Sequence, residues 1–178
     1  SVSSPLTKSE TRTLLETLKS SARPLALLGQ GVNRLARKQI PSGLLLGGLP
    51  MVNMERPRGV NDPSLGAFPE VLKESDLILL LGKKLDFGLK FGDDSVLSAN
   101  ANIIHVDHDM SVLDQAKKSV QPDRLIISAQ SDPLSIIDIL NSNNVAVTEK
   151  WINKIQSALD YKPKEWTFLE NSTKNPMH

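Results

Sequence analysis

The 178-residue chain contains no cysteine. It can therefore form no disulfide bond, no thiolate metal site and no cysteine nucleophile. An excess of one charge is also missing, because 21 Lys and Arg oppose 20 Asp and Glu for a net charge of +1. This balance predicts neither a nucleic acid nor a membrane as a partner. A chain without cysteine suits the cytoplasm or another reducing compartment, which is where we expect it.

Long hydrophobic runs and known catalytic motifs are missing as well. No apolar run approaches the length of a membrane span, and the N-terminus lacks the pattern of a signal peptide. The sequence has no P-loop and no Gly-x-Ser-x-Gly nucleophile elbow. Ser, His and Asp are present, but nothing arranges them as a catalytic set. We therefore expect a binding module from a larger enzyme, with no catalytic residues of its own.

Short apolar runs alternate with helical patterns over most of the chain. The run at residues 77–81 is apolar at every position, so a strand there must be covered on both faces, as in a parallel sheet. The alternation predicts an α/β fold: a doubly wound, mostly parallel sheet with helices on both faces, Rossmann-like. Strands are expected at residues 25–28, 51–54, 77–81, 103–106 and 125–127, and helices at 8–19, 33–39, 69–75, 111–118, 133–140 and 149–159.

The expected elements form one domain over residues 1–160, a usual size for a single core. Pro41 and Gly43 should shorten or break the helix at residues 33–39. Residues 161–178 are polar and contain proline, which predicts a linker toward a missing C-terminal domain.

Two glycines, Gly29 and Gly31, follow the first expected strand and precede a helical pattern. Glycine at this place lets the backbone approach a phosphate, and the helix N-terminus offers free N–H groups. The third glycine of the dinucleotide fingerprint is replaced by Arg34. The pair therefore predicts either a phosphate contact or a plain tight turn.

Carboxylates follow another buried strand in the sequence Asp107-His108-Asp109. A carboxylate at a strand end can accept hydrogen bonds from both hydroxyls of a ribose. The alternative is a helix N-cap for the pattern at residues 111–118. A metal site at His105 and Asp107 would lack a third ligand in the sequence.

Gly82 ends the run at residues 77–81 and is followed by Lys83 and Lys84. Cations at a strand end can meet a diphosphate, and the alternative is a solvated surface pair. Glycine and charge thus gather at three expected strand ends, where α/β domains bind ligands.

Four segments occur in a characteristic order: Arg-Pro-Leu-Ala-Leu-Leu-Gly-Gln-Gly at residues 23–31, Arg-Gly-Val-Asn-Asp-Pro at 58–63, Ser-Asp-Leu-Ile-Leu-Leu-Leu-Gly at 75–82 leading into Leu-Asp-Phe-Gly-Leu-Lys-Phe-Gly at 85–92, and Ile-Ile-His-Val-Asp-His-Asp at 103–109. In order and spacing the chain resembles the central domain of thiamine diphosphate-dependent enzymes of the acetolactate synthase, oxalyl-CoA decarboxylase and 2-hydroxyacyl-CoA lyase type.

The resemblance implies a lyase, decarboxylase or synthase that acts on 2-keto or 2-hydroxyacyl substrates. Thiamine diphosphate and Mg²⁺ would be held by N- and C-terminal domains outside this chain, and the parent enzyme would be a homo-oligomer. The central domain would bind FAD or ADP, or serve as a scaffold. The residues that match the family's nucleotide loops and ribose-end carboxylates are Gly29, Gly31, Gly82, Lys84, Leu85, Asp107 and Asp109.

Some positions depart from the family pattern. Lys84 stands where acetolactate synthases usually have arginine, and Ser-Ala-Gln at residues 128–130 stands where the family often has Gly-Asp. A structural or interface module without a nucleotide is therefore the alternative. A stand-alone NAD-dependent oxidoreductase ranks last, because the full glycine fingerprint and a catalytic acid or base are missing.

Overall fold

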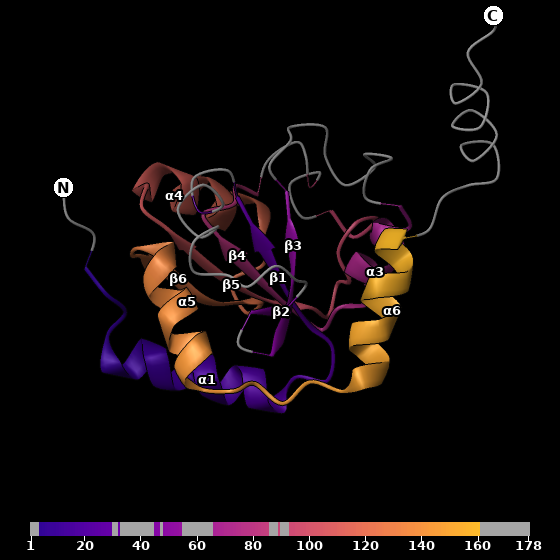
Figure 1. Cartoon of the computed structure of the whole chain (residues 1–178). Coiled ribbons are helices and arrows are strands. Elements are labelled where there is room, and N and C mark those ends of the chain that lie inside the picture. The colour runs from indigo at the N-terminus through magenta and orange to yellow at the C-terminus, as the bar shows by residue number, and fades with distance from the viewer. Residues whose placement is uncertain are drawn as a thin grey trace, which may run out of the picture.

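The computed structural model describes residues 4–29, 32, 45–46, 48–54, 66–85, 89 and 93–160. Figure 1 shows one central sheet with helices on both of its faces. The elements run in the order α1 (Lys8–Ser20), β1 (Pro24–Leu28), β2 (Leu45–Leu46), β3 (Leu49–Asn53), α3 (Phe68–Glu74), β4 (Leu77–Leu81), β5 (Asn102–Asp107), α4 (Met110–Ser119), β6 (Leu125–Gln130), α5 (Pro133–Ser142) and α6 (Glu149–Asp160).

The six strands lie in the order β2-β3-β1-β4-β5-β6. All neighbouring pairs are parallel except β2 and β3, which pair antiparallel. The strand order reverses direction between β1 and β4, because the chain moves outward from β1 to β3 and then crosses back to β4. Such a reversal opens a crevice at the carboxyl ends of the two strands, where ligands of doubly wound domains bind.

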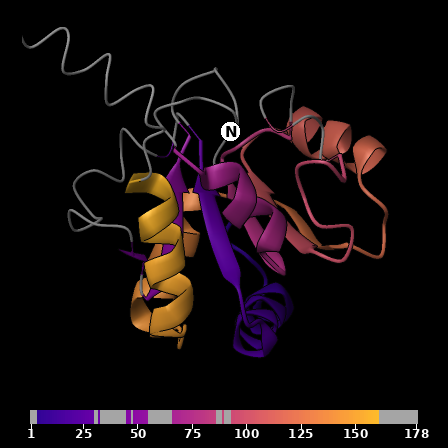
Figure 2. The same ribbon diagram turned by 90° about the vertical axis from the view of Figure 1, so that its right-hand side faces the viewer.

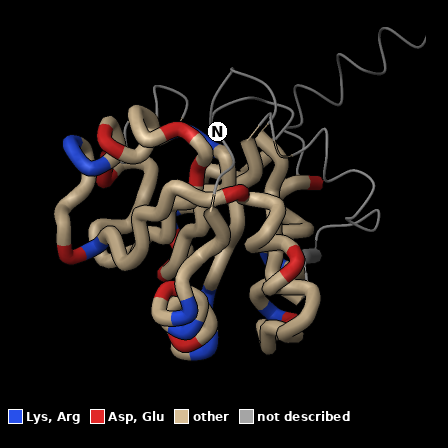
Figure 3. Tube along the Cα trace, turned by 90° about the vertical axis from the view of Figure 1, so that its left-hand side faces the viewer, with Lys and Arg blue, Asp and Glu red and all other residues tan. Residues whose placement is uncertain are grey.

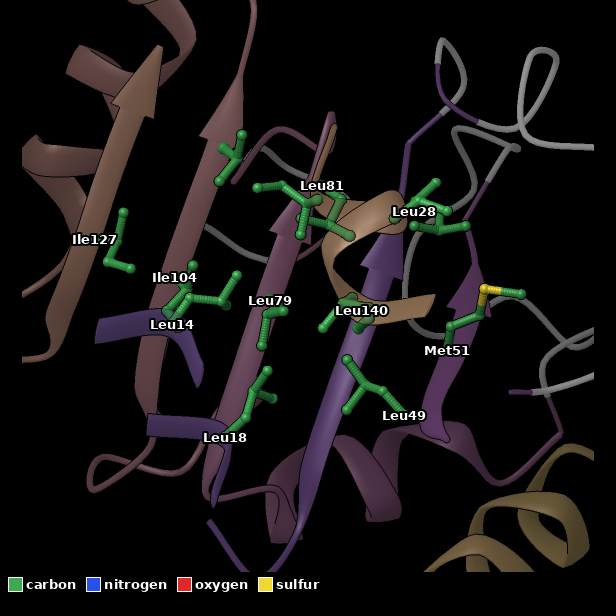
Figure 4. Packing of buried hydrophobic residues seen from close by; sticks show 14 of the residues in the cluster. Leu14, Leu18, Leu28, Leu49, Met51, Leu79, Leu81, Ile104, Ile127 and Leu140 are labelled. Atoms are coloured by element: carbon green, nitrogen blue, oxygen red, sulfur yellow. The ribbon is translucent and has the colours of Figure 1, made fainter. Parts of the chain in front are cut away.

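Successive side chains of β4 enter opposite cores, which explains why the strand is apolar throughout. Leu77, Leu79 and Leu81 belong to one buried cluster and Ile78 and Leu80 to the other. Helices α1 and α5 supply Leu14, Leu18 and Leu140 to the first cluster, as Figure 4 shows. Helices α3, α4 and α6 cover the second face, and Figure 2 shows α3 beside α6. The predicted doubly wound α/β fold is confirmed.

Local sequence signals account for the helix starts. The Thr7 hydroxyl accepts a hydrogen bond from the Glu10 amide, and the Glu10 side chain accepts one from the Thr7 amide, which is a complete capping box. Asp109 caps α4, and Asp132 caps α5 with proline in its first turn. The expected helices at the two ends of the described chain, α1 and α6, lie where the sequence predicts them.

A carboxylate fastens the start of β1 to the start of β4. Asp76 accepts hydrogen bonds from the Ser21 hydroxyl and from the Ala22 and Arg23 amides. Burial raises the pKa of this carboxyl, but the three hydrogen bonds outweigh it, and the pKa of Asp76 falls below its usual value. The turn after α1 is thus held beside the turn after α3.

The N-terminus of helix α5 lies near the end of β4, where the strand order reverses, although the chain enters the helix from the edge strand β6. A Cβ placed on Gly82, after β4, would lie 3.6 Å from Cγ of Pro133, the first residue of α5. Helix α1, the first element of the chain, packs instead against β6, the last strand. Because α1 covers the edge strand β6, α5 can place its N-terminus at the carboxyl ends of the central strands.

Some expectations differ from the structure or lie outside its description. The two-residue strand β2 was not expected, β3 begins at Leu49 rather than Met51, and β6 extends to Gln130. The expected helix at 33–39, Gly31 and the expected linker at 161–178 lie outside the described residues. Within the described ranges, no helix is long and apolar enough to cross a membrane. Figure 3 shows acidic and basic positions interspersed along the trace.

Candidate functional site

A pocket of about 270 Å³ lies at the carboxyl ends of the central strands. Its walls come from the residue after β4, from the turn between β5 and α4, and from the first turns of α4 and α5. The lining residues are Val32, Gly82, Lys84, Asp107, His108, Asp109, Val112, Asp132 and Leu134. The pocket thus occupies the side of the sheet where the reversed strand order leads one to expect a ligand.

The backbones after β1 and β4 touch each other beside this pocket. The Gly29 amide donates a hydrogen bond to the Leu81 carbonyl, at 3.1 Å. A Cβ placed on Gly29 would lie 1.8 Å from the carbonyl oxygen of Gly82, closer than any real contact. Glycine at position 29 is therefore required by the close approach of two main chains.

Gly82 is required for its conformation. Its φ is +61°, in the left-handed region that side chains disfavour, and its amide donates to the Val106 carbonyl at 2.9 Å. A Cβ at this position would lie 2.5 Å from Cγ2 of Val32. The two glycines together let the main chains after β1 and β4 lie against each other where the strand order reverses.

Two carboxylates follow β5 and are held by local hydrogen bonds. Asp107 is 8% exposed, and its Oδ1 accepts a bond from the Asp109 amide at 2.9 Å. Asp109 caps α4 by accepting bonds from the amide and the hydroxyl of Ser111, at 2.9 and 2.7 Å. These bonds fix both side chains in the wall of the pocket. The helix-cap interpretation of Asp109 is therefore correct as far as the local structure goes.

The hydrogen bonds from Ser111 lower the pKa of Asp109, and the nearby ammonium of Lys84 lowers it further. Asp109 is therefore ionised at neutral pH. Lys84 is exposed and lines the pocket with Asp109, so a cation and an anion stand at its mouth. This is the only lysine or arginine among the described residues that line the pocket, against three aspartates.

The rim opposite Lys84 joins the β5–α4 turn to the N-terminus of α5. Nε2 of His108 lies 3.6 Å from Oδ1 of Asp132, which also accepts the Leu134 amide at 2.9 Å. The side-chain amide of Gln130 donates to the His108 carbonyl at 3.0 Å. A protonated His108 therefore forms an ion pair with the α5 cap, and the rim is held from two strands.

A buried histidine contacts the main chain that leads into the pocket residue Lys84. His105 is fully buried in β5, and its Nε2 lies 3.1 Å from the carbonyl oxygen of Lys83. Burial lowers the pKa of His105, although Asp107 and the bond to Lys83 oppose this effect. The imidazole is therefore neutral at physiological pH. Within the described chain its Nδ1 has no hydrogen-bond partner.

The structure brings four of the seven predicted site residues into the pocket wall: Gly82, Lys84, Asp107 and Asp109. Gly29 contacts Gly82 from the neighbouring strand end. The Leu85 side chain is 3% exposed and packs in the second core cluster, so only its main chain is left to face a ligand. Gly31 is outside the described residues. Ligand contact by any of them stays a prediction.

Several lining residues were not predicted as part of the site. Leu134 and Asp132 come from the start of α5, which the sequence signals only as a helix cap. Val32 and Val112 are ordinary apolar residues with no signal of their own. Among the described residues, no cluster of three His, Asp or Glu could hold a metal ion.

The arrangement can bind polar ligands but shows no catalytic set. Asp107 and Asp109 use Oδ1 in their local bonds, so Oδ2 of each is left to accept a hydroxyl. Lys84 can pair with an anionic group, and the glycine backbones permit close approach. A nucleophile with an adjacent base does not occur among the described pocket residues.

Comparison with known proteins finds a shared fold. No protein-family profile and no curated protein matches the chain. Among solved structures, it is similar to the thiamine diphosphate-dependent 4-hydroxybenzoylformate decarboxylase of Rhodococcus jostii RHA1, with a TM-score of 0.54 and 20% sequence identity. The match covers 81% of this chain and 29% of the decarboxylase chain. This chain therefore spans less than a third of the larger protein and shares the fold of that part.

Proposed function

We propose that this chain is the nucleotide-binding central domain of a larger thiamine diphosphate-dependent enzyme. The observation that carries the proposal is the pocket at the strand-order reversal, lined by Gly82 and by the carboxylates Asp107 and Asp109 at the next strand end. The shared fold with a domain-sized part of a thiamine diphosphate-dependent decarboxylase supports the same assignment. The four sequence segments that resemble the central domain of that enzyme class include both glycines and both carboxylates.

A nucleoside diphosphate matches the chemistry of the pocket residues. Ribose hydroxyls would donate to Asp107 and Asp109, and the diphosphate would lie against the Gly29 and Gly82 backbones beside Lys84. ADP and FAD share this part. Lysine holds a phosphate as a point charge rather than by a bidentate fork, so a moderate affinity is expected.

In this proposal, carbon–carbon bond chemistry is supplied by thiamine diphosphate with Mg²⁺ on other domains. The described residues of this chain offer neither a metal cluster nor a catalytic pair. The part played by this domain is to bind, orient and support. The 2-keto or 2-hydroxyacyl substrate and a homo-oligomeric parent enzyme belong to the same proposal.

Pocket size favours a second candidate, a structural module with no nucleotide. Ligand pockets usually measure about 300–1,000 Å³, and this one measures about 270 Å³. Three aspartates against one lysine also oppose a diphosphate. In this alternative the pocket is a remnant, and the sheet serves only to join neighbouring domains.

Denaturation in the presence of ADP, FAD or CoA distinguishes the two candidates. A ligand at 100 times its Kd stabilises the folded state by about 2.7 kcal/mol. We expect such a gain with ADP or FAD, and a weaker one in Lys84→Met. Lys117→Met is the matched control, because this exposed lysine lies on α4 and pairs with Asp114 outside the pocket.

A flat response to all three ligands would favour the structural module. The isolated chain should also show no turnover of 2-keto acids, with or without added thiamine diphosphate and Mg²⁺. Measurable turnover would contradict both candidates.

A further inference from the structure

His105 does not line the pocket, although Asp107, two residues later on the same strand, does. It occupies the middle of β5, where its register partners are Leu80 on β4 and Ser128 on β6. The side chain is fully buried and, two residues after Ile103 on the same strand, faces the side of the sheet that carries the second core cluster. A polar ring at such a place costs free energy unless it makes a hydrogen bond.

The single hydrogen bond of the imidazole goes to the main chain after β4. Nε2 lies 3.1 Å from the Lys83 carbonyl oxygen. A carbonyl oxygen can only accept, so Nε2 carries the proton, and Nδ1 is left as an acceptor without a partner in the described chain. A leucine would fill the space without this unpaired nitrogen. The bond to Lys83 is therefore the one compensation that the structure offers for a buried histidine.

The carbonyl that His105 holds belongs to the peptide unit that leads into Lys84. The chain turns there, directly after the left-handed Gly82, and Lys84 reaches the pocket wall while Leu85 returns to the core. Lys84 stands close enough to Asp109 to lower the pKa of that carboxyl. A rotation of the peptide between residues 83 and 84 would move the only described cation of the pocket.

We infer that His105 is a positioning residue for the ligand site: through its bond to the Lys83 carbonyl it orders the turn after β4 and so sets Lys84 against the pocket. The inference rests on the proposed nucleotide-binding function for its effect on affinity, but the ordering of the turn does not depend on any ligand. His105 touches no ligand in this role and takes no part in chemistry.

Three variants of the full chain separate positioning from packing. His105→Leu removes the donor but keeps an apolar side chain in the core. His105→Gln restores a donor, because the amide nitrogen of Gln can occupy the place of Nε2. Ser128→Ala is the matched control, since Ser128 is the register partner of His105 and its buried hydroxyl has no partner in the described chain. Its removal should leave stability nearly unchanged or slightly higher.

Amide hydrogen exchange is measured on a peptide covering residues 80–85, because a general packing defect would not speed exchange selectively in this turn. We expect exchange in this peptide to be about tenfold faster in His105→Leu and close to wild type in His105→Gln and Ser128→Ala. With ADP as probe, His105→Leu should bind about five- to tenfold more weakly, and His105→Gln should recover most of the affinity.

If His105→Leu does not fold, His105→Asn takes its place, because its shorter amide does not reach the Lys83 carbonyl. The inference would be overturned if the peptide exchanged at the wild-type rate in His105→Leu or His105→Asn. It would also be overturned if His105→Gln lost as much affinity as His105→Leu. If the wild-type chain binds none of ADP, FAD and CoA, the proposed function fails, while the exchange measurement still decides whether His105 orders the turn.

Discussion

At the scale of single residues, the site depends on two glycines, because neither position can carry a Cβ atom without cost. The structure shows two different reasons for the two positions. Gly29 lacks room, since the neighbouring main chain lies where its Cβ would be. Gly82 has a left-handed backbone conformation that residues with a side chain disfavour. A Cβ at this position would contact a methyl group of Val32, which can move. Substitution should therefore harm the two positions to different degrees.

Gly29→Ala is expected to destabilise the fold by about 3 kcal/mol or more, because the clash at 1.8 Å is with a carbonyl that cannot step aside without moving β4. Gly82→Ala should cost less, about 1–2 kcal/mol for the left-handed backbone, since Val32 can shift. Urea denaturation of both variants gives the comparison. A larger loss in Gly82→Ala would show that the contact between the two strand ends is looser than described.

The buried His105 predicts a dependence of stability on pH. Its folded pKa lies below the usual value of 6.5, because burial disfavours the charged ring. The unfolded chain therefore binds the proton first as pH falls, and the free energy of unfolding should decline from about pH 6.5 down to the folded pKa. Denaturation midpoints from pH 8 to 5 measure this decline. His105→Gln should flatten the curve, and an unchanged curve would exclude His105 as its source.

At the scale of elements, the helix caps serve both the fold and the pocket. The start of α5 was predictable, because an aspartate followed by proline is a strong local signal. Its place in the pocket was not predictable. Helix α5 begins beside the end of β4, although the chain enters it from β6, and it then contacts β2. This path depends on packing between residues far apart in the sequence. Lining by Asp132 and Leu134 was missed for that reason.

The cap of α5 can be tested apart from its charge. Asp132→Ala removes the acceptor for the Leu134 amide and should cost about 1 kcal/mol of stability. Asp132→Asn keeps the cap but removes the charge that faces His108, so its stability at neutral pH should stay within a few tenths of a kcal/mol of wild type. Thermal unfolding at pH 7.5 compares the two. Equal losses would mean that the ion pair, rather than the cap, stabilises this end of the helix.

At the scale of the whole molecule, the sequence predicted a mostly parallel sheet but not all of its strands. The runs that became β1 and β4 are apolar at every position, which indicates burial on both faces, and both strands were predicted with bounds close to those observed. Strand β5 was also predicted within one residue of each end, although it contains His105. Strand β2 was missed, because two residues become a strand only by pairing with Leu49 and Pro50. Strand ends with glycine and aspartate pointed to the pocket, whereas its apolar walls at Val32 and Val112 required the assembled fold.

The last helix is tied to the first strand, which predicts that the domain unfolds as one unit. The indole Nε1 of Trp151 on α6 donates to the Pro24 carbonyl at 2.9 Å, although 127 residues separate them. In a Trp166→Phe background, the fluorescence of Trp151 should therefore change at the same urea concentration as the far-ultraviolet circular dichroism. An earlier fluorescence change would show that α6 detaches before the sheet unfolds.

The packing of α1 against the last strand, β6, also affects how the protein folds during its synthesis. Helix α1 is translated before every strand of the sheet, and β6, against which it packs, follows more than a hundred residues later. Leu14 and Leu18 share a core cluster with residues of β1, β4, β5 and β6, so part of their cover is missing until β6 is made. We therefore expect a chaperone at the ribosome exit tunnel to bind this helix while it is only partly covered.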